Sequence, residues 1–149
     1  MTVGKFCVRE TIVAKKDSNI VDVAKLMRRH HVGDVIVVEE RDGLAVPIGI
    51  VTDRDLVMEI LAQELSPETV AVGDIMSYEM LVARESDSLW DTLQQMRVKG
   101  VRRVPVIDGK GALAGILTLD DVLELLTDEL AELAKIVRRE QEREYKSRR

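Results

Sequence analysis

The chain has 149 residues, enough for one domain or for two small halves that depend on each other. Apolar residues make up 46% of it but aromatic residues only 3%, so we expect a core of aliphatic side chains and methionine, with β-branched strands covered by leucine-rich helices. The formal net charge of −5 argues against general nucleic-acid binding, because that affinity comes mainly from neutralising phosphates.

The first half of the chain is predicted to form a β-α-β-β-α unit. An extended piece at 11–14 leads through a polar turn into a helix whose apolar residues recur every three or four positions. Buried strands are predicted at 34–38 and 47–51, joined as a hairpin through the turn at 41–43. A second helix begins at the segment TDRD, residues 52–55, and residues 66–77 connect this unit to the second half.

The second half repeats the first. Ile12 aligns with Leu81, an offset of 69 (81 − 12), and Gly49 aligns with Gly115, an offset of 66 (115 − 49), so the first hairpin is three residues longer. The matching elements are an extended piece at 80–83, a helix with Leu89, Leu93 and Met96 on one face, strands at 103–107 and 113–117, and a helix starting at TLDD, residues 118–121. The sequence therefore predicts two copies of one unit.

The last helix continues into a charged stretch. Leu126, Leu130, Leu133 and Val137 lie on one side, which we expect to dock on the rest of the protein or on a partner helix. From about Glu140 the charges alternate in sign, which favours a solvated helix over a nucleic-acid arm. We divide the chain into repeat 1 at 6–66, repeat 2 at 67–134 and a charged helical tail at 135–149.

Cysteine content and hydropathy indicate the setting. Cys7 is the only cysteine, so one chain can form neither an internal disulfide nor a thiolate metal cluster. No apolar run reaches the roughly 18 to 20 residues that span a bilayer, and the first ten residues lack the apolar core of a secretion signal. We therefore expect a cytoplasmic protein without a metal site that binds neither membranes nor nucleic acid. The RRHH segment at 28–31 is interpreted as cations at a helix C-terminus.

Each hairpin ends in the same pattern, GIVTDRD at 49–55 and GILTLDD at 115–121. One interpretation is structural: threonine and aspartate three residues apart form a capping box for the first helical turn. The other is functional: a strand that runs into a helix N-terminus gathers amide donors, glycine lets a flat base approach, and the aspartate accepts hydrogen bonds from ribose hydroxyls. The pattern alone leaves both interpretations open.

Arginines supply candidate phosphate contacts. Arg102 and Arg103 precede a strand in a mostly acidic protein, and Arg54 lies within TDRD. Guanidinium groups bind phosphate oxygens in forked pairs, although a solvated strand edge accounts for the same residues. Repeat 1 has Gly33 and Asp34 where repeat 2 has the two arginines, so the two corners are unequal.

Two such repeats, each closing with G-h-h-T-x-x-D, with VGDIM before the second and GVRRVPVID within it, resemble a tandem pair of cystathionine beta-synthase (CBS) domains from about Phe6 to about Leu133. The resemblance implies an α/β fold in which two β-α-β-β-α repeats pack through their sheets with pseudo-twofold symmetry and leave two clefts. It also implies an adenine-bearing ligand in one or both clefts: AMP, ADP or ATP, with NAD and S-adenosylmethionine as further candidates. No obligatory cofactor and no catalytic role are implied.

The same resemblance implies roles for residues of this chain. Ribose binding is expected from Asp55 and Asp121, supported by Thr52 and Thr118, and phosphate binding from Arg102, Arg103 and Arg54. The expected walls of the base pocket are Ile12, Val32, Ile50, Val82, Val101, Pro105, Gly115 and Ile116. We expect the cleft that holds Asp121 with Arg102 and Arg103 to be the stronger site.

The predicted function is that of a sensor. We expect a homodimer that binds an adenine nucleotide and passes a ligand-dependent conformational change to a regulated protein. A ligand-independent dimerisation or interaction scaffold, with TDRD and TLDD acting only as helix caps, is the alternative, and an unrecognised nucleotide hydrolase is another. Trp90, beside the buried stripe of its helix, either widens the core or anchors a subunit interface.

Overall fold

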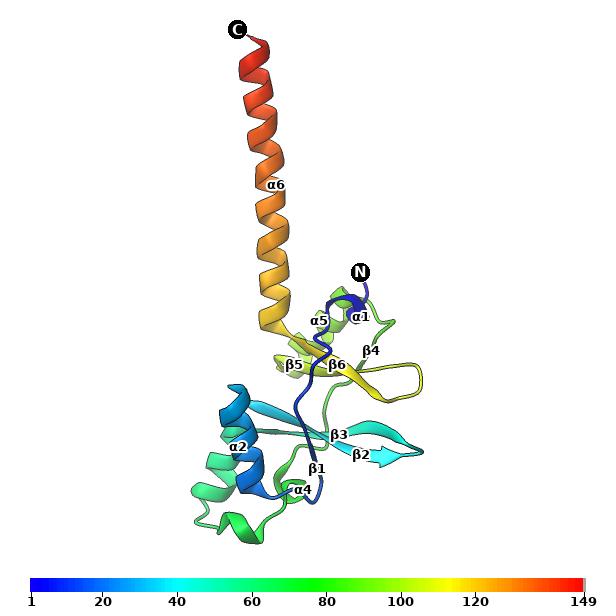
Figure 1. The fold of residues 1–149 in the computed structure, drawn as a ribbon, viewed down its shortest axis with the longest axis vertical. Coiled ribbons are helices and arrows are strands. Elements are labelled where there is room, and N and C mark those ends of the chain that lie inside the picture. The colour runs from blue at the N-terminus through cyan, green and yellow to red at the C-terminus, as the bar shows by residue number, and fades with distance from the viewer. Residues whose placement is uncertain (149) are drawn as a thin grey trace.

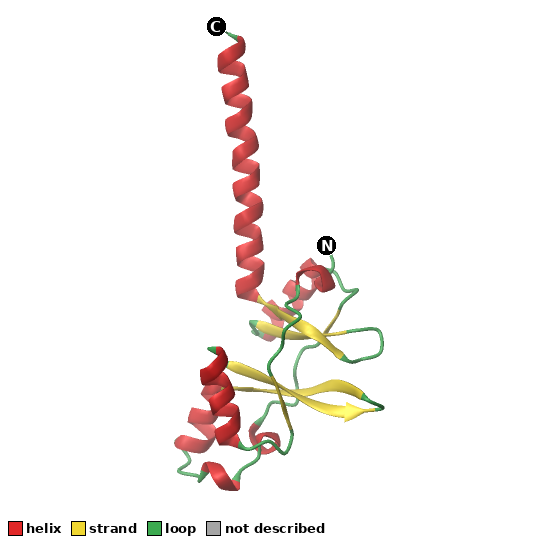
Figure 2. Ribbon diagram, in the orientation of Figure 1, coloured by secondary structure: helices red, strands yellow, loops and turns green. Residues whose placement is uncertain are grey.

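The computed structural model, described for residues 1–148, contains two three-stranded sheets, one from each repeat (Figures 1 and 2). In repeat 1, β1 (Val13–Lys15) is parallel to β2 (Asp34–Arg41), which pairs antiparallel with β3 (Leu44–Thr52). In repeat 2, β4 (Ala83–Arg84), β5 (Arg103–Ile107) and β6 (Leu113–Thr118) are ordered in the same way. The predicted α/β architecture of two like repeats is confirmed.

The helix after the first strand is equivalent in the two repeats. α2 (Ile20–His30) and α5 (Leu89–Lys99) are each 11 residues long, and their N-caps are Asn19 and Ser88, whose side chains accept backbone N–H groups of the first turn. Each helix ends at a residue in the left-handed conformation, His31 (φ 53°) and Gly100 (φ 68°). The last turn of α2 carries basic side chains, as the interpretation of RRHH expects.

The helices that close the two repeats differ in length. In repeat 1, α3 (Asp53–Asp55) continues into one π-helical turn, η1 (Leu56–Leu61), and the 3₁₀ turn η2 (Pro67–Thr69) follows. In repeat 2, α6 (Leu119–Ser147) runs unbroken for 29 residues and projects away from both sheets (Figure 1). No helix within residues 1–148 is long and apolar enough to cross a membrane.

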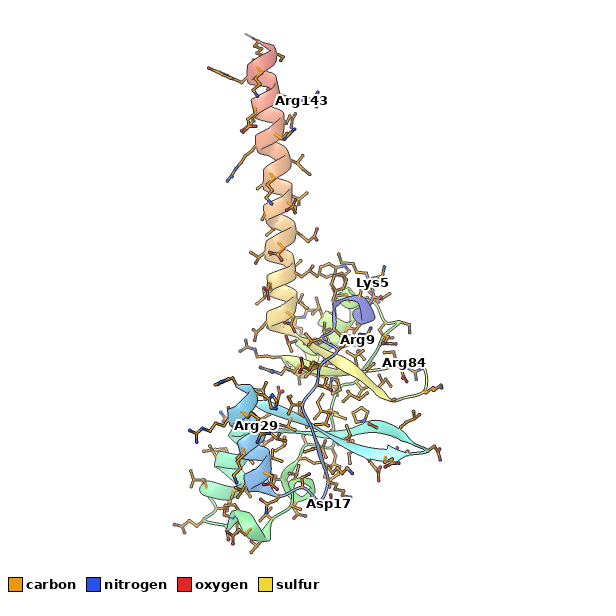
Figure 3. All side chains as sticks on the ribbon, viewed as in Figure 1. Lys5, Arg9, Asp17, Arg29, Arg84 and Arg143 are labelled. Carbon is orange, nitrogen blue, oxygen red and sulfur yellow. The ribbon has the colours of Figure 1, made fainter. Side chains whose placement is uncertain are left out.

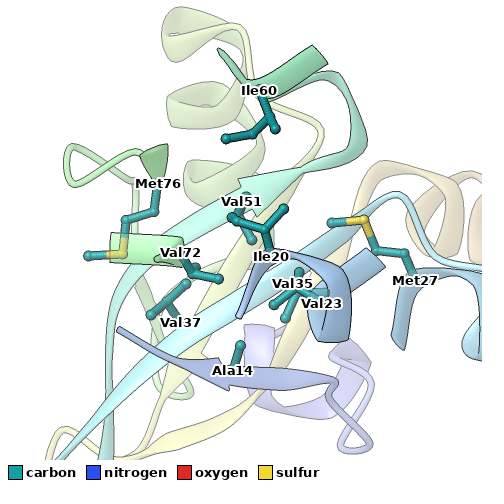
Figure 4. Close-up of a cluster of buried hydrophobic side chains, with 10 residues drawn as sticks. All are labelled: Ala14, Ile20, Val23, Met27, Val35, Val37, Val51, Ile60, Val72 and Met76. Atoms are coloured by element: carbon teal, nitrogen blue, oxygen red, sulfur yellow. The ribbon is translucent and has the colours of Figure 1, made fainter. Parts of the chain in front are cut away.

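The hydrophobic core consists of two clusters, one in each repeat, and each cluster includes a segment from the other half of the chain. The cluster of repeat 1 contains Val72 and Met76, from α4 (Val72–Ile75) and the residue after it (Figure 4). The cluster of repeat 2 contains Val3, from the first helical turn of the chain, α1 (Val3–Phe6). Val3 and Val72 are both fully buried and lie 69 positions apart (72 − 3), so the exchange is reciprocal.

Backbone hydrogen bonds hold both exchanged segments in place. Val8 exchanges two N–H···O bonds of 2.9 Å with Ile116 at the edge of the repeat 2 sheet, and Ser77 makes the equivalent pair with Ile50. Arg9, labelled in Figure 3, ties the first segment further, because its guanidinium contacts the Glu85 carboxylate. The same guanidinium donates to the Gly4 carbonyl within the segment at 2.7 Å. The two packed units therefore differ from the contiguous stretches 6–66 and 67–134, which remain a division of the sequence.

Candidate functional site

A cleft of about 750 Å³ opens where the two repeats face each other. Repeat 1 contributes the end of β3 and the start of α3, and repeat 2 contributes the residues before β4 and the start of β5. The volume falls within the range of sites that bind small molecules. Its walls include the apolar residues Ile50, Met80, Leu81, Val101 and Pro105 and the polar residues Asp34, Thr52, Asp53, Arg54, Ser77, Glu79, Arg102 and Arg103.

Arg103 is held in this cleft by an ion pair that joins the repeats. Its Nε lies 2.7 Å from Oδ2 of Asp34, and a second guanidinium nitrogen lies 3.3 Å from Oδ1, so the contact is forked. The Asp34 side chain is 10% exposed and that of Arg103 34%. Burial raises the pKa of the Asp34 carboxyl above its ordinary 3.8, and the Arg103 guanidinium opposes part of this rise. Arg103 is therefore occupied by a structural contact.

Arg54 and Arg102 are less constrained by ion pairs than Arg103. Arg102 pairs with Asp120 at 3.1 Å, but both side chains are mostly exposed, so this pair is weak. Arg54 lines the cleft and forms no ion pair with any residue of the described chain. Arg54 and Arg102 thus come from different repeats and are the guanidinium groups available to an anionic ligand.

The threonine and aspartate of each G-h-h-T-x-x-D pattern cap their own helix. Oδ2 of Asp55 accepts the Thr52 N–H at 2.9 Å, and Thr52 Oγ1 accepts the Asp55 N–H at 3.1 Å, which completes a capping box. In repeat 2 the Thr118 hydroxyl donates to Oδ2 of Asp121 at 2.6 Å and accepts the Asp121 N–H at 3.1 Å. Both aspartates are in the structural role, and their predicted ribose role stays a prediction.

The glycine of each pattern lies under an exchanged segment. A Cβ at Gly115 would lie 2.6 Å from the Val8 carbonyl oxygen, and one at Gly49 would lie 2.9 Å from the Ser77 carbonyl oxygen. Close passage of the neighbouring backbone therefore requires glycine at these positions. The expected role of Gly115 as a wall of a base pocket stays a prediction, and the first exchanged segment passes directly over this residue.

The cleft brings together about half of the predicted site residues. It is lined by Ile50, Thr52, Arg54, Val101, Arg102, Arg103 and Pro105, and it is not lined by Asp55, Thr118, Asp121, Ile12, Val32, Val82, Gly115 or Ile116. The expected grouping of Asp121 with Arg102 and Arg103 stays a prediction, and Asp121 does not line this cleft. Those arginines line a cleft with Thr52 of the opposite repeat, because the loop before β5 faces the end of β3, whereas Asp121 caps α6.

Several lining residues were missed from the sequence. Asp34 and Arg103 occupy the same position of the two repeats, 69 residues apart (103 − 34), so a pseudo-twofold arrangement brings them together. Their opposite charges are the signal that would have predicted the pair. Ser77, Glu79 and Met80 follow the exchanged segment of α4, and no pattern in the sequence marks them.

Comparison with known proteins identifies similar chains. A family model described as CBS domain matches residues 3–62 and again residues 72–128. The uncharacterized protein MK0525 of Methanopyrus kandleri is 36% identical over 125 residues, which is 84% of this chain and 62% of that protein, so the chain spans less than two thirds of this relative. The CBS domain-containing protein YhcV of Bacillus subtilis is 35% identical over 106 residues, 71% of each chain.

Solved structures show the same fold. The CBS domain pair of protein MJ0100, solved in complex with 5′-methylthioadenosine and S-adenosyl-L-methionine, has a TM-score of 0.73 to this chain. The match covers 87% of this chain and 98% of the other, at 23% sequence identity. At this identity the likeness shows the arrangement of the two repeats and not a shared ligand.

Proposed function

Because the chain belongs to the CBS domain family and carries two tandem repeats, we propose that it is a regulatory protein that binds an adenosine ligand between them. The cleft of about 750 Å³, with walls from both repeats, carries this proposal. A ligand that contacts both repeats favours the arrangement in which both sets of contacts form, and this shifts the population of a surface read by another protein. In this proposal the protein acts as a homodimer on a separate regulated protein.

The lining residues suggest how such a ligand is held. The apolar side chains of Ile50, Val101 and Pro105 provide faces for an adenine ring. Arg54 and Arg102 provide donors for a phosphate or carboxylate. Asp53 lines the cleft beside them and is a candidate acceptor for ribose hydroxyls. Asp55 lies two residues further along, outside the lining, and stays a proposed acceptor as well. The MJ0100 domain pair shares this fold and was solved with two adenosyl ligands, so the fold accommodates ligands of this class.

The charges that line the cleft indicate which adenosine ligands it favours. Three arginines (54, 102 and 103) stand against three acidic side chains, Asp34, Asp53 and Glu79. Such a balanced lining does not offset the four negative charges of ATP. We therefore propose that AMP or S-adenosylmethionine binds more tightly than ATP.

Isothermal titration calorimetry of the purified protein with AMP, S-adenosylmethionine and ATP tests this proposal. We expect AMP or S-adenosylmethionine, or both, to have a dissociation constant at least about tenfold lower than that of ATP. We also expect Arg54→Gln to weaken AMP binding about tenfold. Arg97→Gln is the matched control, because this exposed arginine on α5 lies outside the cleft. If none of the three ligands binds, or if both variants bind AMP as the native protein does, the proposed site is wrong.

The scaffold alternative is favoured by one observation, the capping bonds of Asp55 and Asp121. Asp55→Ala separates the two functions. In a pure scaffold the substitution removes one helix-capping contact and lowers the free energy of unfolding by about 1 kcal/mol. A pure scaffold binds no ligand, so no affinity can change. In a sensor whose ribose is bound by Asp55, AMP affinity falls about tenfold in addition.

A further inference from the structure

The outer part of α6 lies outside both packed units. Every residue from 127 to 147 is exposed, and side chains project into solvent all along the helix, with Arg143 near its far end (Figure 3). Most helical stability in proteins comes from the packing of one face, and no other helix or strand within residues 1–148 covers this stretch in the single chain. An extension of about 20 residues therefore needs a surface to pack on.

One face of α6 has the spacing of a coiled-coil seam. Apolar residues alternate at steps of four and three along the helix: Leu119, Leu123, Leu126, Leu130, Leu133 and Val137. This is the 3.5-residue repeat of two helices that wind around each other. Leu130 is 67% exposed, Leu133 59% and Val137 53%, so the outer half of the seam is uncovered in the single chain.

Charge along α6 is strongly divided. Residues 119–134 contain six acidic residues and no basic one, whereas residues 135–148 contain six basic and three acidic residues. In a parallel pair of such helices, the acidic half of one helix would lie against the acidic half of the other, and like charges would repel. In antiparallel orientation the acidic half of each lies along the basic half of the other.

We propose that α6 pairs with α6 of a second copy of this chain as an antiparallel coiled coil. A crossing point between Ala131 and Glu132 puts Leu130 opposite Leu133 of the second copy and Leu126 opposite its Val137, so the four central layers are apolar. The same register brings Asp120 level with Arg143 of the second copy and Glu124 level with its Arg139. One arrangement thus buries the exposed apolar residues at the centre of the seam and places acidic residues of one helix beside basic residues of the other.

Sedimentation equilibrium of the full-length protein over a wide concentration range tests the pairing. We expect the native protein to be a dimer and Leu130→Glu to raise its dissociation constant by about a hundredfold or more, since each dimer loses two buried leucines and gains two charges at the seam. Ala131→Glu is the matched control, because it adds the same charge one residue away, outside the seam. Leu130 is exposed and belongs to neither core cluster, so both variants should keep the two packed units folded, which circular dichroism checks.

Ionic strength tests the orientation. Added salt screens attraction between opposite halves, so the antiparallel dimer should dissociate more readily in high salt. A native protein that is monomeric at all concentrations, a Leu130→Glu variant that dimerises normally, or a dimer unchanged or tightened by salt would each overturn the proposal. The pairing is independent of the proposed ligand cleft, so failure of ligand binding leaves these outcomes unaffected.

Discussion

Asp34 and Arg103 form one ion pair, but replacing Arg103 should destabilise the protein more than replacing Asp34. Arg103→Met keeps much of the side-chain length but removes the guanidinium, and it leaves the Asp34 carboxylate, only 10% exposed, without its cation. Losing one partner of a buried pair typically costs about 3 to 5 kcal/mol. Because Arg103 itself is 34% exposed, water fills part of its place, and we expect a loss of about 2 to 3 kcal/mol in the free energy of unfolding.

Thermal unfolding followed by circular dichroism measures this loss. For a chain of this size the melting temperature should fall by roughly 5 to 10 °C. Arg102→Met is the matched control, since the adjacent Arg102 forms only the exposed pair with Asp120 and should cost less than about 0.5 kcal/mol. Equal losses in the two variants would refute the assignment of Arg103 to a buried contact.

The pH dependence of Arg103→Met gives a second check. The pKa of Asp34 is raised in the folded protein, so the native state binds this proton more tightly than the unfolded state, and stability from this group falls as pH rises from 3.8 through the raised pKa. Without the guanidinium the pKa of Asp34 rises further and the loss extends to higher pH. The deficit of the variant should be largest above the raised pKa of Asp34 in the variant and shrink as pH falls through that raised pKa, because a protonated carboxyl no longer needs the cation. A deficit that is the same across this range would contradict the reasoning.

Three further substitutions and one control, Gly109→Ala, test other contacts by the same thermal unfolding assay. Asp34→Asn should cost less than Arg103→Met, because the half-buried arginine left behind is hydrated more easily than a buried carboxylate; a larger loss would reverse this ranking. Gly115→Ala should cost about 2 kcal/mol, since its Cβ meets the exchanged segment, whereas Gly109→Ala, with no atom within 4 Å of its Cβ, should stay within about 0.5 kcal/mol. Val3→Ala should cost about 2 kcal/mol, and an unchanged melting temperature would show that the first turn of the chain is not part of the core.

The repeated unit was predictable from the sequence because its signals are local. Apolar spacing in α2 and α5, hairpin turns and the paired G-h-h-T-x-x-D patterns each depend on a few neighbouring residues. The reciprocal exchange was not predicted. The sequence indicates it only through the similarity of two four-residue helical turns, 3–6 and 72–75. These turns are too short to suggest which core each of them enters.

The candidate site was predictable only in part, because it depends on contacts between distant segments. Ile50, Arg54 and Val101 line the cleft as expected: Ile50 lies near the end of β3, Arg54 in the helical turn that follows it, and Val101 in the loop before β5. The pattern at Thr52 and Asp55 fits a helix cap and a ribose acceptor equally well, and only the hydrogen bonds show the capping role. The pairing of Arg103 with Asp34 depends on how the repeats face each other, which no local pattern encodes.

The reciprocal exchange sets an order of events on the ribosome. The first turn of the chain leaves the exit tunnel before any of the strands that will cover it, and Val3 must stay unburied until β6 and the start of α6 have been made. Repeat 1 likewise stays incomplete until Met76 has been translated. The nascent protein therefore completes the core of repeat 1 first, and it leaves Val3 exposed until the second hairpin and the start of α6 have been made.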